Sequence, residues 1–152
     1  MIVGVPKEIK AQEHRVGLVP SSVRELVAHG HTVLVESGAG AGINYTDADY
    51  EASGAEIIKN TKDIFAKADM IIKVKEPQPN ECKMLREGQV LFTYLHLAAD
   101  PEQAKGLMNS KCIAIAYETV TGPGGRRLPL LEPMSEIAGR LSIQVGGAYL
   151  LK

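Results

Sequence analysis

The sequence predicts an α/β fold with a mostly parallel sheet and flanking helices, which ends in a long helix. Two observations support this prediction. Short runs rich in β-branched residues recur along the chain, and helix start and stop signals lie between them. Such alternation favours parallel strands joined by helices, and ligands of these folds meet the loops at the carboxyl ends of the strands. We therefore expect functional residues in those loops.

Six runs are short enough to be strands. They cover residues 2–5, 32–35, 56–58, 70–74, 90–93 and 112–116.

The first connecting helix is predicted from a capping-box spacing between Ser22 and Glu25 and from Gly30, where a helix can end in a left-handed residue. Its apolar stripe would consist of Val23, Leu26 and Val27.

The later connections carry similar signals. Thr46 and Asp49 repeat the capping-box spacing, and Thr61 can cap a helix that reaches residue 67. Pro101 suits the first turn of another helix.

The pattern changes at the turn-rich residues 122–127, which predict a domain edge. A helix is then expected from Pro133 onward, because Ile137, Leu141, Val145 and Ala148 recur at helical spacing. We predict a first segment of a domain over residues 1–128 and a linker helix over residues 129–152. The apolar stripe of this helix is unfinished, so we expect a fragment whose missing part lies downstream.

The composition excludes several classes of protein. There are 17 Lys and Arg residues against 18 Asp and Glu, which argues against a dedicated nucleic-acid or membrane-surface binder. The apolar runs are shorter than the roughly 20 residues of a membrane helix, and the N-terminus does not read as a secretion signal. A cytoplasmic location is expected. Cys82 and Cys112 lack metal-ligand spacing and are expected to be buried, reduced thiols.

A glycine-rich stretch at residues 38–42 follows the second strand run. Glycine-rich turns after strands can hold a pyrophosphate through backbone N–H groups. The spacing here is GxGxG, and Ile43 stands where the third glycine of GxGxxG belongs. A structural loop is therefore favoured over a dinucleotide site.

A charged loop follows the first strand. Solvated side chains are the preferred interpretation for Lys7, Glu8, Lys10 and Glu13. Arg15 differs, because the apolar residues 16–19 that follow would draw it toward a packed surface, where its guanidinium needs an acceptor. A bound carboxylate would serve.

Lys73 and Lys75 follow the fourth strand run. In an extended strand they point the same way, and Pro77 would end the strand, so that Lys75 stands at a carboxyl end. An ammonium there can polarise a carbonyl. From spacing alone, a pair of surface lysines is the preferred interpretation.

His96 lies in an otherwise apolar run at the end of the fifth strand. A lone histidine in such a run is more often a core residue than a catalyst. Histidine as a residue type nevertheless suits proton transfer near neutral pH, and the position of His96 makes it a catalytic candidate.

Several motifs together resemble one family. They are GVPKE at residues 4–8, EHRVGLVP at 13–20, KVKEP at 73–77, YLHLAAD at 94–100 and LPLLEPMSEIAGR at 128–140. These motifs cover nearly the whole chain in order. They resemble the N-terminal part of the alanine dehydrogenase and pyridine nucleotide transhydrogenase family. YLHLAAD at residues 94–100 and PMSEIAGR at residues 133–140 resemble its alanine dehydrogenase branch more closely than its transhydrogenase branch. Gln12 stands where the signature usually has Asn.

The resemblance implies a Rossmann-like or flavodoxin-like substrate-binding domain and the reversible, NAD-dependent oxidative deamination of L-alanine to pyruvate and ammonium. It further implies that Arg15 binds the substrate carboxylate, Lys75 contacts the reacting end of the substrate, and His96 is the acid/base. By the same resemblance, Tyr94 and Met134 would line the methyl pocket and Ser135 would reach the cofactor. For these last three residues, a core or helix-cap role remains open.

In this family the chain continues into a Rossmann domain that binds most of the NAD. We therefore predict that these 152 residues alone are inactive. The family also implies a homo-oligomer. Two alternatives remain: the nucleotide-binding alpha subunit of a proton-translocating transhydrogenase, and a binding module for small carboxylates without catalysis.

Overall fold

The computed structural model describes residues 1–151. It divides into two compact units, Met1–Ala116 and a second unit that begins at Tyr117.

The first unit is built on a six-stranded sheet in which every pairing is parallel. The strand order is β3-β2-β1-β4-β5-β6, which is the order of the doubly wound Rossmann fold. This confirms the α/β prediction. The strands are β1 (Ile2–Val5), β2 (Thr32–Glu36), β3 (Glu56–Ile58), β4 (Met70–Ile72), β5 (Val90–Thr93) and β6 (Ile113–Ala116).

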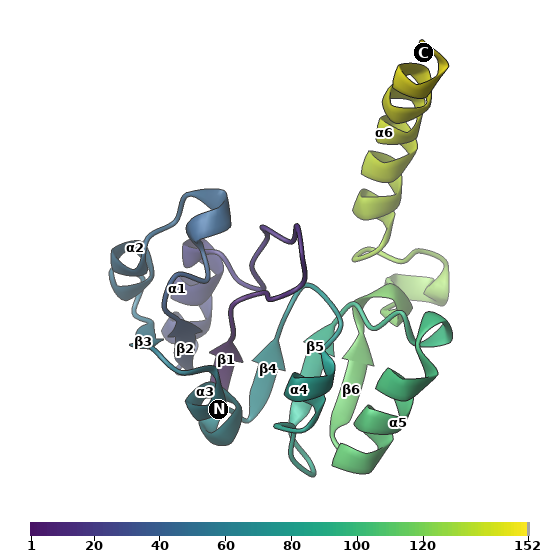
Figure 1. Cartoon of the computed structure of the whole chain (residues 1–152). Coiled ribbons are helices and arrows are strands. Elements are labelled where there is room, and N and C mark those ends of the chain that lie inside the picture. The colour runs from purple at the N-terminus through teal and green to yellow at the C-terminus, as the bar shows by residue number, and fades with distance from the viewer. Residues whose placement is uncertain (152) are drawn as a thin grey trace. The chain divides into compact units, whose positions relative to one another are not determined.

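Helices cover both faces of this sheet. In Figure 1, α3, α4 and α5 lie in front of it. One core cluster joins the sheet to these three helices, and a second joins it to α1 and α2. The helices are α1 (Pro20–Ala28), α2 (Asp47–Glu51), α3 (Thr61–Lys67), α4 (Pro79–Cys82) and α5 (Pro101–Ser110), and the 3-10 turns are η1 (Ala41–Ile43) and η2 (Leu97–Ala99).

The helix ends confirm some predicted signals and correct others. The capping box of Thr46 and Asp49 is present, and Gly30 has a φ of +78° just beyond α1. The capping box of Ser22 and Glu25 is wrong, because α1 begins at Pro20, whose ring presets the helical φ.

The N-cap of α3 lies one residue before the predicted position. Asn60 is the N-cap of this helix, and its side chain accepts a hydrogen bond from the amide of Lys62 at 3.0 Å. Thr61, which was expected to cap the helix, is its first residue.

One face of the outer strand β6 is exposed. Ala116 packs into the core beside α5, whereas Ile113 and Ile115 point to the other face and are 53% and 40% exposed.

The second unit contains η3 (Tyr117–Thr119), η4 (Pro123–Gly125) and the long α6 (Glu132–Leu150). The 19-residue α6 confirms the predicted final helix, and none of its side chains is buried. Across residues 1–151, none of the helices combines the length and the apolar character that a membrane crossing requires.

Candidate functional site

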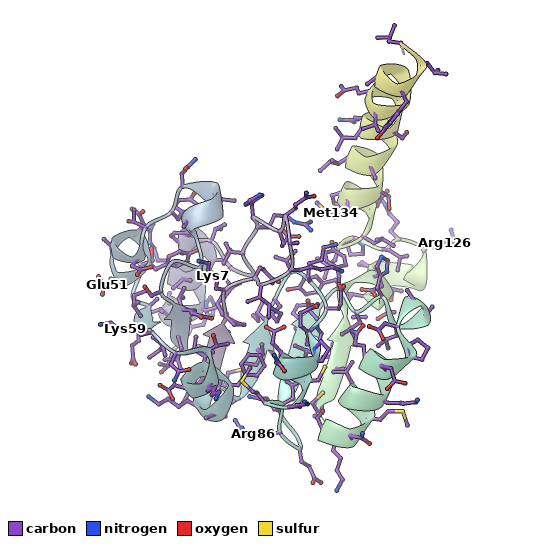
Figure 2. All side chains as sticks on the ribbon, in the orientation of Figure 1. Lys7, Glu51, Lys59, Arg86, Arg126 and Met134 are labelled. Carbon is purple, nitrogen blue, oxygen red and sulfur yellow. The ribbon has the colours of Figure 1, made fainter. Side chains whose placement is uncertain are left out.

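The candidate residues of the first unit lie where the strand order reverses. β1 pairs with β4 and β4 pairs with β5, so the loops that follow these three strands are neighbours at the carboxyl edge of the sheet. Figure 2 shows Lys7 at this edge, just after β1, and Arg86 at the opposite edge. In open α/β sheets, such a switch point is the usual place for a ligand.

Arg15 comes from the loop after β1 and is held by Glu13. Its Nε donates to Glu13 Oε1 at 2.8 Å and its Nη2 donates to Oε2 at 2.6 Å. The backbone amide of Arg15 also donates to Oε1 at 2.8 Å. This bidentate pair fixes the plane of the guanidinium and lowers the pKa of Glu13 to about 2. The Arg15 side chain is 43% exposed, whereas that of Glu13 is only 6% exposed.

Lys75 comes from the loop after β4. Its carbonyl accepts a hydrogen bond from Thr93 Oγ1 at 2.9 Å, and its amide lies 3.4 Å from Glu8 Oε1. β4 ends at Ile72, so Lys75 lies in a bend beyond the strand rather than in the extended continuation that the sequence predicted.

Electrostatic effects indicate that these groups are close together. Tyr94 and Glu8 both raise the pKa of Arg15, after the larger effect of Glu13, and Lys75 contributes to the low pKa of Glu13. The structure therefore gathers Arg15, Lys75 and Tyr94 at one edge of the sheet.

His96 lies at the same edge, two residues after Tyr94. It is exposed and has a left-handed backbone, with φ of 54° and ψ of 34°, at the start of η2. A residue other than glycine rarely adopts this conformation, and such positions are enriched at functional sites. The core interpretation of His96 is therefore wrong.

A buried group of charges lies under these loops. Lys73 is 0% exposed, and its Nζ lies 2.8 Å from Glu81 Oε1 and 3.3 Å from Glu8 Oε2. The preferred interpretations of Lys73 and Glu8 as solvated side chains are therefore wrong. No sequence signal reveals this cluster, since Glu8 is 65 positions away from Lys73.

Two further candidates lie in the second unit, at the start of α6. Met134 is partly buried and is labelled in Figure 2, whereas Ser135 is exposed. The amide of Ser135 donates to the carbonyl of Leu131 at 3.1 Å, as expected within the first turn of a helix.

The glycine-rich loop at residues 38–42 is packed against its own chain. A Cβ on Gly42 would lie 2.4 Å from the carbonyl oxygen of His14, and one on Gly40 would lie 2.6 Å from Tyr50. The amide of Gly38 donates to Asp47 Oδ1 at 2.8 Å. These contacts explain the glycines without a pyrophosphate.

A separate hollow lies beside α4 and α5. It has a volume of about 690 Å³ and does not include the candidate residues. Its lining includes Glu76, Gln78, Cys82, Gln103 and Gly106.

Both cysteines are free thiols, and burial raises the pKa of Cys82. Cys82 is buried as expected, whereas Cys112 is only partly buried. Over residues 1–151, His, Cys, Asp and Glu side chains form no group of three suited to a metal ion.

Comparisons with known proteins agree on one family. The family model described as alanine dehydrogenase/PNT, N-terminal domain, matches residues 4–138. Alanine dehydrogenases of Methanococcus maripaludis and Bacillus subtilis are each 55% identical over the 152 residues of this chain, which spans 40% and 39% of their lengths.

Solved structures give the same result. A solved L-alanine dehydrogenase has a TM-score of 0.90 at 55% identity and covers 99% of this chain, which corresponds to 41% of that structure. A transhydrogenase from Sinorhizobium meliloti is more distant, with a TM-score of 0.73 and 31% identity over 78% of this chain and 34% of its own. The chain belongs to the family of alanine dehydrogenase/PNT N-terminal domains.

Proposed function

We propose that this chain provides the substrate-binding part of an NAD-dependent alanine dehydrogenase. The parent protein would convert L-alanine reversibly to pyruvate and ammonium. The observation that carries this proposal is the strand pairing that places Arg15, Lys75 and Tyr94 in neighbouring loops at the switch point of the sheet, in a chain 55% identical to alanine dehydrogenases.

In this proposal Arg15 binds the substrate carboxylate. Glu13 occupies Nε and Nη2 of the guanidinium. A substrate carboxylate would therefore bind on the side of Nη1, where it would replace any partner that this side of Arg15 has in the substrate-free chain. The planar guanidinium suits two parallel hydrogen bonds to a carboxylate. Glu13 thereby sets the orientation in which the substrate is held.

Lys75 and His96 would act at the reacting carbon. The Lys75 ammonium would offset negative charge on the oxygen of pyruvate or of the carbinolamine. His96 would move a proton as water adds to the imine carbon and ammonia leaves. Tyr94 and Met134 would line the space for the substrate methyl group.

The cofactor NAD would accept the hydride when it is bound. The glycine-rich turn of this chain does not fit its pyrophosphate, since the amide of Gly38 is used by Asp47 and the loop is closely packed. We therefore propose that NAD is held mainly by another part of the parent protein. Ser135 would be a contact from this chain.

Three further expectations stay predictions. They are the division between residues 1–128 and 129–152, a cytoplasmic location and a homo-oligomer. The oligomer is suggested by apolar side chains on α6, among which Leu141 and Val145 are 50% and 55% exposed. Sedimentation velocity of this chain would test self-association.

The alternative of a transhydrogenase subunit has weaker support, because the solved transhydrogenase is 31% identical and the solved L-alanine dehydrogenase is 55% identical. A module that binds carboxylates without catalysis would keep the role of Arg15 and lose that of His96.

Two measurements test the proposal. Pyruvate titrated into the ¹⁵N-labelled chain should shift the amides around Arg15 and Lys75, and Arg15→Met should abolish these shifts. Arg24→Met, on the exposed side of α1, is the matched control and should leave them unchanged. No shift in the unmodified chain would contradict substrate binding by this unit.

The second measurement concerns catalysis. The chain joined to the remaining three fifths of the Bacillus subtilis relative should produce NADH with alanine, whereas the chain alone should not. In the joined protein, His96→Asn should abolish this activity while pyruvate binding persists, because Asn tolerates the left-handed backbone. Retained activity in the variant would remove His96 from the chemistry, whereas an inactive joined protein that still binds pyruvate would favour the module without catalysis.

A further inference from the structure

The buried charges below the site suggest a role for a residue outside the proposed catalytic set. We propose that Glu8, oriented by Lys73, is a positioning residue that holds the main chain of Lys75 in place. This inference rests on the proposed function, in which Lys75 contacts the substrate.

The two oxygens of Glu8 have different partners. Oε1 accepts a hydrogen bond from the amide of Val74 at 2.6 Å and lies 3.4 Å from the amide of Lys75. Oε2 lies 3.3 Å from Nζ of Lys73. Glu8 therefore connects the loop after β1 to three successive residues after β4.

The neutralisation of Lys73 does not require Glu8. Glu81 already pairs with this ammonium at the shorter distance of 2.8 Å, and the side chains of both residues are 1% exposed. A second buried carboxylate adds a charge whose desolvation is unfavourable, and burial raises the pKa of Glu8. Its backbone contacts after β4 are the contribution that Glu81 does not supply.

Other contacts hold the same segment from its remaining sides. Thr93, which is fully buried at the end of β5, donates to the carbonyl of Lys75 at 2.9 Å. Lys10, two residues after Glu8, forms an ion pair with Glu76. The main chain of Lys75 is thus held at its amide side from the β1 loop and at its carbonyl from β5.

Two isosteric variants separate positioning from general stabilisation. A glutamine at position 8 has one oxygen, so it can accept from Lys73 or from Val74 but not from both, and its NH₂ group then faces a donor. Glu81→Gln also removes one buried carboxylate beside Lys73, yet Glu81 accepts from the amide of Gln78 at 2.8 Å and not from those of Val74 or Lys75. Glu81→Gln is therefore the matched control.

Three quantities are measured on the full chain with each variant: the unfolding midpoint in urea, hydrogen exchange of the Val74 and Lys75 amides, and the Kd of pyruvate. We expect both variants to lower the midpoint. Only Glu8→Gln should accelerate exchange at Val74 and Lys75 and weaken pyruvate binding by about tenfold or more, because small misplacements of a binding group are costly. Glu81→Gln should bind pyruvate within about threefold of the unmodified chain.

The positioning role is overturned if the two variants change exchange and binding equally, or if Glu8→Gln leaves both unchanged. If the unmodified chain does not bind pyruvate, the proposed function fails separately. Exchange at Val74 and Lys75 then decides the positioning role by itself: faster exchange in Glu8→Gln alone supports it, and any other result overturns it.

Discussion

Replacement of Lys73 by methionine should be one of the most destabilising single changes in the first unit. Its ammonium lies 2.8 Å from one carboxylate of the buried cluster and 3.3 Å from the other, and all three side chains are at most 2% exposed. Methionine fills a similar volume but leaves Glu8 and Glu81 facing each other without a cation. Breaking a buried ion pair in this way costs about 3–5 kcal/mol, a large part of the roughly 5–15 kcal/mol that stabilises a typical domain.

The pH dependence of this loss has a definite sign. Burial already raises the pKa of Glu8 above the ordinary value of 4.5 in the folded chain, and without the Lys73 ammonium this pKa rises further. The folded state then binds more protons than the unfolded state as the pH falls toward 4.5, so acid stabilises the variant. The deficit of Lys73→Met relative to the unmodified chain should therefore be largest at pH 7 and smaller at pH 5.

Urea unfolding followed by far-UV circular dichroism at both pH values measures these free energies. The matched control is Lys105→Met on α5, because Lys105 pairs with Glu102 at 2.7 Å while its side chain is 67% exposed. An exposed pair of this kind contributes about 0–1 kcal/mol. Equal losses in the two variants at pH 7, or a deficit of Lys73→Met that grows as the pH falls, would refute the reasoning.

Three other outcomes are expected. The Glu13 carboxyl should titrate with a pKa of about 2, measured by the side-chain ¹³C shift, because Arg15 binds its ionised form. The stabilising contribution of this ion pair is then present above pH 4.5 and is lost as the pH falls toward 2. A titration midpoint above pH 4 would contradict the ion pair. Gly42→Ala should destabilise the chain by about 1–3 kcal/mol in urea unfolding, since the new Cβ would lie 2.4 Å from the backbone oxygen of His14, and an unchanged midpoint would refute this close approach. Asp100→Ala should cost about 1 kcal/mol by the same assay, because its side chain caps α5, and a loss below about 0.3 kcal/mol would show that the cap contributes little.

The strands were the most predictable part of the fold. β1, β3 and β5 have the predicted bounds, because apolar runs flanked by turn signals are local features of the sequence. β4 stops at Ile72, two residues earlier than expected. The next two residues, Lys73 and Val74, alternate polar and apolar as a half-buried strand does, but the chain bends there to bring Val74 and Lys75 under Glu8.

The charged residues were predictable only in part. Arg15 could be singled out because an apolar segment follows it. Glu8, Glu13 and Lys73 look like solvated residues in sequence, and their burial depends on contacts that pattern analysis does not detect. Glu8 finds its partner 65 positions along the chain, through a pairing of β1 with β4 that follows from topology and not from local propensity.

The wrong prediction that these charged residues are solvated and the location of the proposed site have a common cause. A reversal of strand order brings together loops that are distant in sequence, and the polar backbone of these loops lacks the regular hydrogen bonds of the sheet. Buried side chains must then satisfy that backbone, as Glu8 does for Val74 and Thr93 does for Lys75. The residues that sequence patterns misplace are thus those that connect separate loops at the switch point. In a fold of this class, a charged residue that proves to be buried just beyond a strand end is accordingly a candidate for supporting the site as well as for stabilising the core.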